Sequence, residues 1–353
     1  MGPSMCRLQV AWLVLAVLLA ACGSTSGSAP TSADSTAGKV PTAGPPPVAA
    51  TASGAAGEAT LEPISVTNFG PSVNTAFMQY GIQKGFYRAE GLDVSVQYAE
   101  AAVGVQLVAA GHVDFSQAVG SALAAAVHGA PIKVVFPTAD RPLWWMYGQP
   151  SVASTAELRG KTIGTSSAGS SLTIVARMIL ERYGIGPDDA TLVNLGSPQR
   201  LAALQSGAID AGFLLAPYNL VAERTGYRQL FNTRDEGILL ITEGLATGDD
   251  FLRDKPQVVR RVLRASLRAL HGMREDREGA IDTIARFTEV NPEEARQIYE
   301  LALPTWTADG TAEPSAMRQS IEIMKQTVQV DGPVPDDQAF DLRLAREVAA
   351  AGR

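Results

Sequence analysis

Cysteine is nearly absent from this sequence, whose 353 residues contain only Cys6 and Cys22. A network of disulfides is therefore excluded for the chain beyond residue 22. Stability there must come from an apolar core, and a hydrophobic content of 46% is sufficient for one.

Basic residues and histidines are also few. Lys and Arg number 29 against 36 Asp and Glu, so the formal net charge is −7, and the sequence contains no basic patch. This excludes a nucleic acid as an expected partner. The three histidines, His112, His128 and His271, lack the spacing of metal ligands, so we expect neither a metal nor another cofactor.

Long hydrophobic runs are missing too, apart from the twelve residues Val10–Ala21. Such a run is too short to cross a bilayer, but after Arg7 it is typical of a signal peptide, which we place at residues 1–21. The run ends in Leu19-Ala20-Ala21-Cys22, which resembles the lipobox of bacterial lipoproteins. The resemblance implies a lipid on the Cys22 thiol. The alternative is an ordinary secretory signal with an incidental cysteine.

Residues 22–60 are rich in Gly, Ser, Thr, Ala and Pro. We expect a disordered linker there, because such a segment cannot bury enough surface to fold. Lipid and linker would hold a folded part at the cell membrane, facing the periplasm or the cell exterior. About 290 residues remain, which suits two domains.

The remaining sequence predicts an α/β architecture. Short β-rich runs alternate with amphipathic helical patterns as far as Thr242, which indicates largely parallel strands. We expect strands at 64–67, 92–98, 113–115, 132–136, 162–164, 191–195, 208–215 and 238–242. Helices should lie between them, and further helices near 258–270, 277–287, 292–301, 314–328 and 335–350.

Three segments together carry a family resemblance: Gly85–Val94, Glu157–Gly164 and Leu201–Ala211. They resemble the nitrate/sulfonate/taurine-type solute-binding proteins, which are SsuA-like members of the NMT1/THI5-like family. The resemblance implies a type II periplasmic-binding-protein fold, with two mixed α/β lobes joined by a two-strand hinge. Lobe 1 would comprise residues 61–137 plus 243–353, and lobe 2 residues 138–242.

The resemblance also implies a function, namely capture of a small solute between the lobes and delivery to the permease of an ABC importer. We expect a monomer that is not an enzyme. Gly160-Lys161-Thr162 and Gly164-Thr165-Ser166 are incomplete matches to a phosphate-binding loop and a hydrolase motif, so no residue is expected to be catalytic. The alternatives are a ligand-sensing module that feeds a signalling receptor, and a secreted hydrolase built on Ser166 or Ser170.

Candidate ligand-binding residues follow from the rule that α/β sheets bind ligands beyond the carboxyl ends of their strands. Four loops satisfy it, and they contain Phe69, Gly70, Gln117, Gly120, Ser121, Ser166, Gly169, Ser170, Ser171, Pro217 and Tyr218. Trp144 and Trp145, near the first crossing between the lobes, add two aromatic rings that either contact a planar ligand or pack the hinge.

The charge of the ligand is left open by these residues. Gly169, Ser170 and Ser171 open a helix, where free N–H groups favour an anion, although Ser170 could simply cap that helix. Arg141 or Arg200 could also pair with an anion. The expected solute is therefore small and either anionic or aromatic, and nitrate, a sulfonate, a pyrimidine and an aromatic acid all fit.

Replacing Cys22 with alanine tests the predicted anchor. The Cys22→Ala protein lacks the thiol that accepts the lipid, so it should stay uncleaved or be released, while the folded part is unchanged. Membrane fractionation with radiolabelled palmitate measures both outcomes. Cys6→Ala, which should be lipidated normally, is the control, and palmitate on the Cys22→Ala protein would contradict the prediction.

Overall fold

The computed structural model describes residues 60–166 and 170–352, which belong to one compact unit. The predicted signal peptide, Cys22, all of the predicted linker before residue 60, and Gly169 lie outside the described residues. In the described part of the chain, no helix is both long and apolar enough to cross a membrane.

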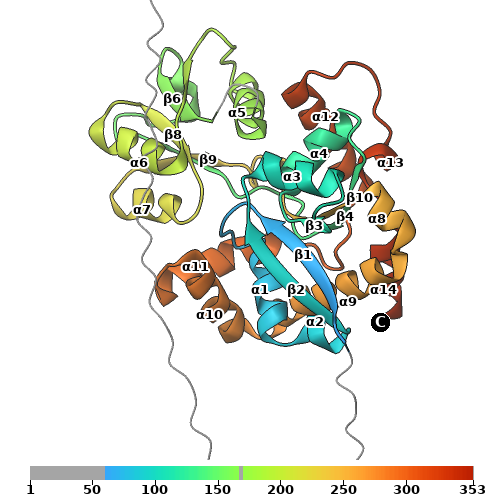
Figure 1. The fold of residues 1–353 in the computed structure, drawn as a ribbon. Helices are drawn as coiled ribbons and strands as arrows, with labels where there is room; N and C mark the ends of the chain where they lie inside the picture. The colour runs from blue at the N-terminus through green and yellow to red at the C-terminus, as the bar shows by residue number, and fades with distance from the viewer. Residues whose placement is uncertain (1–59, 167–169, 353) are drawn as a thin grey trace, which may run out of the picture. The chain divides into compact units, whose positions relative to one another are not determined.

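The first sheet contains five strands in the order β2-β1-β3-β10-β4 (Figure 1). They are β1 (Glu62–Asn68), β2 (Leu92–Tyr98), β3 (Phe115–Ser116), β4 (Ile132–Pro137) and β10 (Gly244–Gly248). β1 pairs in parallel with β2 and β3, whereas β10 runs antiparallel to β3 and β4. The amino end of β10 therefore lies at the sheet edge where β3 and β4 end.

Helices cover both faces of this sheet (Figure 1). One face carries α1 (Ala76–Gln83), α2 (Phe86–Ala89) and α9 (Pro256–Glu275), and the other carries α3 (Ala101–Ala109) and α4 (Val119–Val127). Successive side chains of a strand point to opposite faces, so neighbouring residues of β4 join different cores. Val134 packs in the core of α4, and Val135 packs in the core of α1 and α9.

The second sheet also has five strands, in the order β7-β6-β8-β5-β9. They are β5 (Trp145–Gly148), β6 (Thr162–Thr165), β7 (Thr191–Asn194), β8 (Ala211–Leu214) and β9 (Arg228–Asn232). β6 is parallel to β7 and β8, whereas β5 is antiparallel to β8 and β9. The helical segments that connect these strands are η1 (Thr155–Leu158), α5 (Ser171–Arg182), α6 (Ser197–Ser206) and α7 (Tyr218–Arg224).

Two connecting segments, residues 138–144 and 233–243, cross between the sheets and bond to each other. Thr138 N donates to Glu243 O at 3.1 Å, Leu240 N to Asp140 O at 2.9 Å, and Thr233 N to Trp144 O at 3.0 Å. The expected fold of two mixed α/β lobes with a double connection is thus present. The lobe boundaries given by the sequence stay a prediction.

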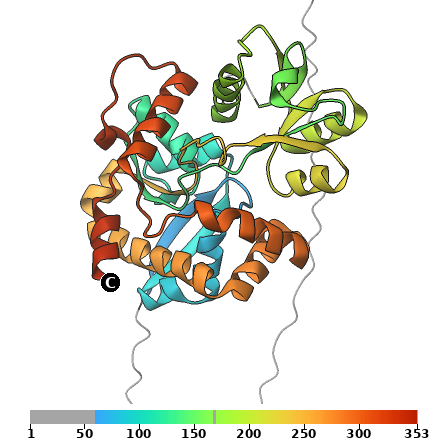
Figure 2. The same cartoon turned by 180° about the vertical axis from the view of Figure 1, so that it is seen from behind.

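The C-terminal third is helical and packs mainly around the first sheet (Figure 2). Its elements are α8 (Asp249–Asp254), α9, α10 (Arg277–Thr288), α11 (Pro292–Ala302), η2 (Leu303–Thr305), α12 (Pro314–Val328), α13 (Asp336–Ala339) and α14 (Arg343–Ala351). Asn291 caps α11, because its side chain accepts the Glu294 N–H at 2.9 Å. α12 contacts both α4 and α5, so it touches helices of both sheets.

Several sequence expectations were wrong. Residues 238–242 do not form a strand, because the N–H groups of Leu239 and Ile241 bond to side chains of α12 rather than to a neighbouring strand. The strands β5, β9 and β10 were missed. The strands are largely parallel as expected, except that β10 in the first sheet and β5 in the second run antiparallel to the other four strands of their sheet. The expected helix 335–350 is divided into α13 and α14. Phe340, which lies between them, forms a β-bridge with Val134.

Gly244 provides a test of the first sheet's construction. Its φ is +144°, and a Cβ added there would lie 2.0 Å from the carbonyl oxygen of Phe136. Gly244→Ala should therefore lower the free energy of unfolding by about 3 kcal/mol or more, from steric overlap and backbone strain together.

Gly70→Ala is the matched control, because Gly70 has a φ of +143° and nothing lies within 4 Å of its added Cβ. It should lose only the strain contribution, about 1–2 kcal/mol. Urea denaturation of both variants measures the difference. Equal losses would mean that the contact with Phe136 is relieved by movement of β10.

Candidate functional site

Loops that follow strands of both sheets border an open cavity of about 320 Å³. Its described lining residues come from loops after β1 and β8, from the helices α3, α4, α5 and α12 and the residues that precede them, and from both connecting segments: Phe69, Ala101, Ala118, Gly120, Ser121, Ala124, Trp144, Ser170, Ser171, Leu215, Thr242, Glu243, Met324 and Thr327. The sequence selected six of them: Phe69, Gly120, Ser121, Trp144, Ser170 and Ser171. The cavity lies where β1, β3 and β8 end, which is the usual ligand position in α/β sheets.

Small residues at the start of α4 leave room for this cavity. Gly120 N donates to the carbonyl oxygen of Thr242 at 2.8 Å, which brings α4 against the second connecting segment. A Cβ on Gly120 would lie 3.5–3.6 Å from atoms of Thr242, in ordinary contact. With Ala118 and Ala124 beside it, this face of α4 presents methyl groups and the Ser121 side chain to the cavity.

The start of α5 forms part of the opposite wall. The Ser170 hydroxyl accepts the Thr173 N–H at 3.2 Å and also bonds to the Thr173 hydroxyl, so the capping interpretation of Ser170 is confirmed. Ser170 and Ser171 both line the cavity as well. The cap that Ser170 forms on α5 therefore does not prevent Ser170 from contacting a ligand in the cavity.

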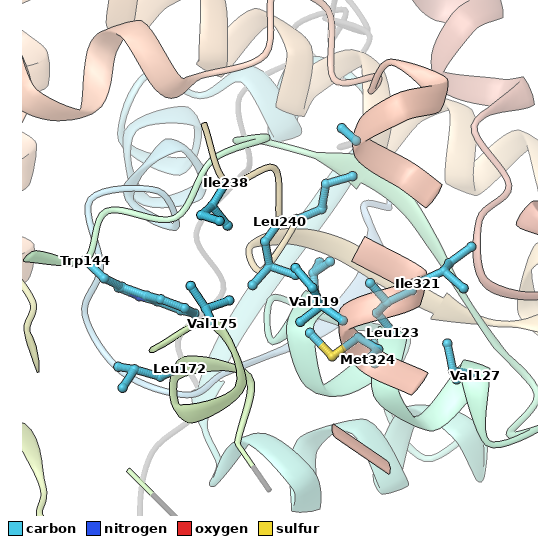
Figure 3. Packing of buried hydrophobic residues seen from close by; sticks show 14 of the residues in the cluster. Val119, Leu123, Val127, Trp144, Leu172, Val175, Ile238, Leu240, Ile321 and Met324 are labelled. Carbon is cyan, nitrogen blue, oxygen red and sulfur yellow. The ribbon is translucent and has the colours of Figure 1, made fainter. Parts of the chain in front are cut away.

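Trp144 brings an aromatic ring to the cavity from the first connecting segment. The ring is 9% exposed, and Figure 3 shows it beside Leu172 and Val175 of α5, within a core that also contains residues of α4 and α12. Trp145 belongs to a separate core with Leu204 and Leu214. The two indoles diverge because consecutive side chains of an extended segment point in opposite directions.

Glu243 is a lining residue that the sequence analysis missed. Its carboxylate accepts a hydrogen bond from the Ser72 hydroxyl at 2.8 Å, and it lines the cavity just before β10. Burial raises the pKa of Glu243 from 4.5 to about 7, although hydrogen bonds from Ser72 and Asn74 oppose this rise. The sequence signal that could have identified Glu243 is an acidic residue shortly after the apolar run 238–241. The rule for strand ends did not select it, because that rule considers only residues that follow strands.

The cavity carries no positive charge among its described lining residues. Arg141 pairs with Asp140 at 3.1 Å. Arg200 is buried and donates to the carbonyl oxygens of Thr165, Leu195 and Phe213, and burial lowers its pKa to about 10. Both arginines considered as anion partners are therefore engaged with the protein, and Glu243 is the one charged residue in the described lining.

Five further predicted site residues, like Trp145, lie outside the described lining. Gln117 is fully buried beneath the site, bonded to the Asn68 amide and the Thr75 carbonyl. Gly70 donates its N–H to the Asn68 side chain at 2.6 Å, and the Ser166 carbonyl accepts the Thr173 hydroxyl at 3.0 Å. Pro217 and Tyr218 begin α7, where Tyr218 packs on the core that contains Trp145. A ligand role for these residues stays a prediction.

Two larger cavities lie elsewhere, and their lining is mostly helical. One, of about 520 Å³, lies between α9 and α14, where Arg264 pairs with Glu90 at 2.7 Å. The other, of about 540 Å³, lies among α7, α10 and α11, where Arg224 pairs with Glu294 at 2.8 Å. Neither is lined by the loops at the strand ends. No cluster of metal-binding side chains is present in residues 60–166 or 170–352.

The family is decided by comparison with known proteins. The NMT1/THI5-like family matches residues 72–280, more than half of the chain. The chain belongs to this family. Its relative RibY of Chloroflexus aurantiacus, a riboflavin-binding protein, is 26% identical over 357 aligned positions, which cover 95% of this chain and 96% of RibY.

Solved structures share the fold at low identity. The putative periplasmic sulfonate-binding protein SsuA of Methylobacillus flagellatus has a TM-score of 0.69 and 16% identity, over 83% of this chain and 95% of SsuA. The desulfurization enzyme DSZB has a TM-score of 0.63 and 16% identity, over 83% of this chain and 100% of DSZB. The predicted family and fold are confirmed, and a putative solute-binding protein of an ABC transporter is among the proteins that share the fold. Because the fold also carries an enzyme, function must be argued from the site.

The raised pKa of Glu243 predicts a pH-dependent stability. The folded protein holds this proton more tightly than the unfolded chain, so the contribution is fully present below about pH 4.5 and is lost as the pH rises to about 7. Glu243→Gln should therefore gain stability over the wild type by at most about 3 kcal/mol between pH 4.5 and 7.5.

Urea denaturation at a series of pH values measures this difference. Glu223→Gln, which removes a carboxyl that does not line the cavity, should keep the wild-type dependence. A constant difference between Glu243→Gln and the wild type across this range would show that Glu243 titrates normally.

Proposed function

We propose that this protein is a solute-binding component of an ABC importer that captures a small, neutral, aromatic solute in the cavity between its two sheets. The observation that carries the proposal is the composition of that cavity, which combines an indole, apolar side chains and hydroxyl groups without a described cation. A sulfonate or nitrate would find no counter-charge among these described residues, and only the start of α5 and the hydroxyl groups would offset its desolvation cost. Of the two ligand classes expected from the sequence, aromatic solutes therefore fit better.

RibY supports the same class of ligand. It binds riboflavin according to its name, and it aligns with nearly the whole of this chain. The isoalloxazine of riboflavin is planar and uncharged, and Trp144 offers an indole to such a ring. We take riboflavin as the first compound to test.

Solute capture would use the double connection as a hinge. Trp144 lies on the first connecting segment, and Thr242 and Glu243 lie on the second, so a bound solute would contact both. Contacts with Leu215 and Ser171 of the second sheet and Phe69 of the first would then favour the closed arrangement. A ligand shifts the hinge equilibrium by the difference in its affinity for the two arrangements.

Delivery would occur outside the cytoplasm, with the protein tethered through Cys22 and acting as a monomer that docks on a permease. An enzymatic role is not part of the proposal. The Ser170 hydroxyl, considered as a nucleophile, is bonded to Thr173 in the helix cap. None of the three histidines belongs to the described cavity lining, and the Glu243 carboxyl that does is bonded to Ser72 rather than to Ser170.

Riboflavin binding tests the proposal. At a hundredfold excess over Kd, riboflavin should raise the Tm by roughly 5 °C. Trp144→Leu should weaken binding about tenfold, because it removes an aromatic contact and part of the buried area.

Trp145→Leu is the matched control. It makes the same change in the neighbouring residue, whose ring packs in another core, so it should lower the Tm and leave the affinity unchanged. Titration by flavin fluorescence at 15 °C measures both affinities. If an alkanesulfonate stabilised the protein and riboflavin did not, the proposed ligand class would be wrong while solute binding would stand.

A further inference from the structure

Glu243 occupies a fixed position in the cavity. The Ser72 hydroxyl holds its carboxyl from the loop after β1, and its backbone carbonyl accepts the Thr138 N–H from the other connecting segment. Asn74, which lies close enough to the carboxyl to lower its pKa, is itself held by the Trp306 indole N–H at 2.8 Å. The Ser72 hydroxyl therefore holds the carboxyl, and the Thr138 N–H holds the Glu243 backbone, before any solute enters.

The anchored carboxyl keeps hydrogen-bonding capacity for a solute. A carboxylate has about four lone-pair sites, and the Ser72 hydroxyl uses one of them. Trp144, Leu215 and Met324 line the same cavity and supply apolar walls, so a solute bound there would displace water from the carboxyl. A carboxyl in such surroundings strongly favours a partner that donates a hydrogen bond.

We propose that Glu243 determines the specificity of the cavity, by pairing with a neutral ring that carries an N–H group beside a carbonyl and by repelling anions. Imides and cyclic amides have this edge. The ionised carboxyl accepts from the N–H, and the protonated carboxyl accepts from the N–H while donating to the adjacent carbonyl. A sulfonate or carboxylate offers only acceptors and a negative charge, so the ionised carboxyl repels it and donates nothing to it, whereas the protonated carboxyl could donate one hydrogen bond to it. The discrimination against anions therefore comes from the ionised form.

This inference rests on the proposed function, since it assigns a recognition group within the same cavity. It makes an additional claim, however. A solute could bind against Trp144 without contacting Glu243, and the experiment below separates these two situations.

The test uses three compounds and three variants of the full chain. Riboflavin has an imide N–H between two carbonyls, 3-methylriboflavin replaces that hydrogen with a methyl group, and hexanesulfonate is an anion of comparable reach. Glu243→Gln retains a donor and an acceptor, and Glu243→Ala retains neither. Glu223→Gln removes a carboxyl that does not line the cavity and serves as the control.

The wild type and Glu223→Gln should bind riboflavin with equal affinity, at least tenfold more tightly than 3-methylriboflavin or hexanesulfonate. Glu243→Gln should bind riboflavin within about threefold of the wild type. Glu243→Ala should lose about tenfold, as expected for one or two hydrogen bonds. In Glu243→Ala the two flavins should differ by less than about threefold, because the group that distinguishes them is gone.

Each other result would overturn the inference. If riboflavin binds the wild type and Glu243→Ala equally, the solute does not contact Glu243, while the proposed function stands. If hexanesulfonate binds the wild type more tightly than riboflavin, the cavity accepts anions, and both the inference and the proposed ligand class fail. If none of the compounds binds while the melting curves show folded protein, both fail as well.

Discussion

The antiparallel insertion of β10 between β3 and β4 is the constraint on which the rest of the structure depends. Because Gly244 lies opposite Pro137, the chain returns from the second sheet beside the point where it left the first. The two connecting segments then lie close enough to bond along 138–144 and 233–243. A double connection of this kind limits relative motion of the sheets mainly to bending, so the cavity beside it can close without losing its walls.

The sequence predicted elements whose signals are local. α12 was placed to the residue, because Pro314 is at its first position and an apolar stripe follows. The buried strand β4 is an apolar run interrupted only by Lys133. β10 was missed because its sequence, Gly-Leu-Ala-Thr-Gly, has neither alternation nor bulky residues. Its partner strands β3 and β4 lie far away in the chain, and no local pattern specifies such a pairing.

The sequence likewise predicted those site residues that a local rule selects, and missed the one whose position depends on a distant strand pairing. The rule for strand ends selected Phe69, Gly120 and Ser171 because they follow strands or open helices at the correct sheet edge. Glu243 precedes its strand, and only an antiparallel strand presents its amino end at that edge, so the rule excluded it. For the pair Trp144 and Trp145, periodicity shows that the rings diverge but not which one faces the cavity.

The absence of a described cation in the cavity has a consequence for solute release. An ion pair weakens only as the inverse of distance, so a salt-bridged solute would stay attracted while the sheets separate. Dispersion contacts with Trp144 and Met324 lose a quarter to a half of their strength over roughly 0.5–1 Å. A hydrogen bond to Glu243 would also weaken steeply with distance and angle. For the proposed neutral solute, a small opening of the hinge therefore removes up to about half of the dispersion contribution and much of the hydrogen bond to Glu243. A permease that favours the open arrangement would then obtain the solute without supplying a competing charge.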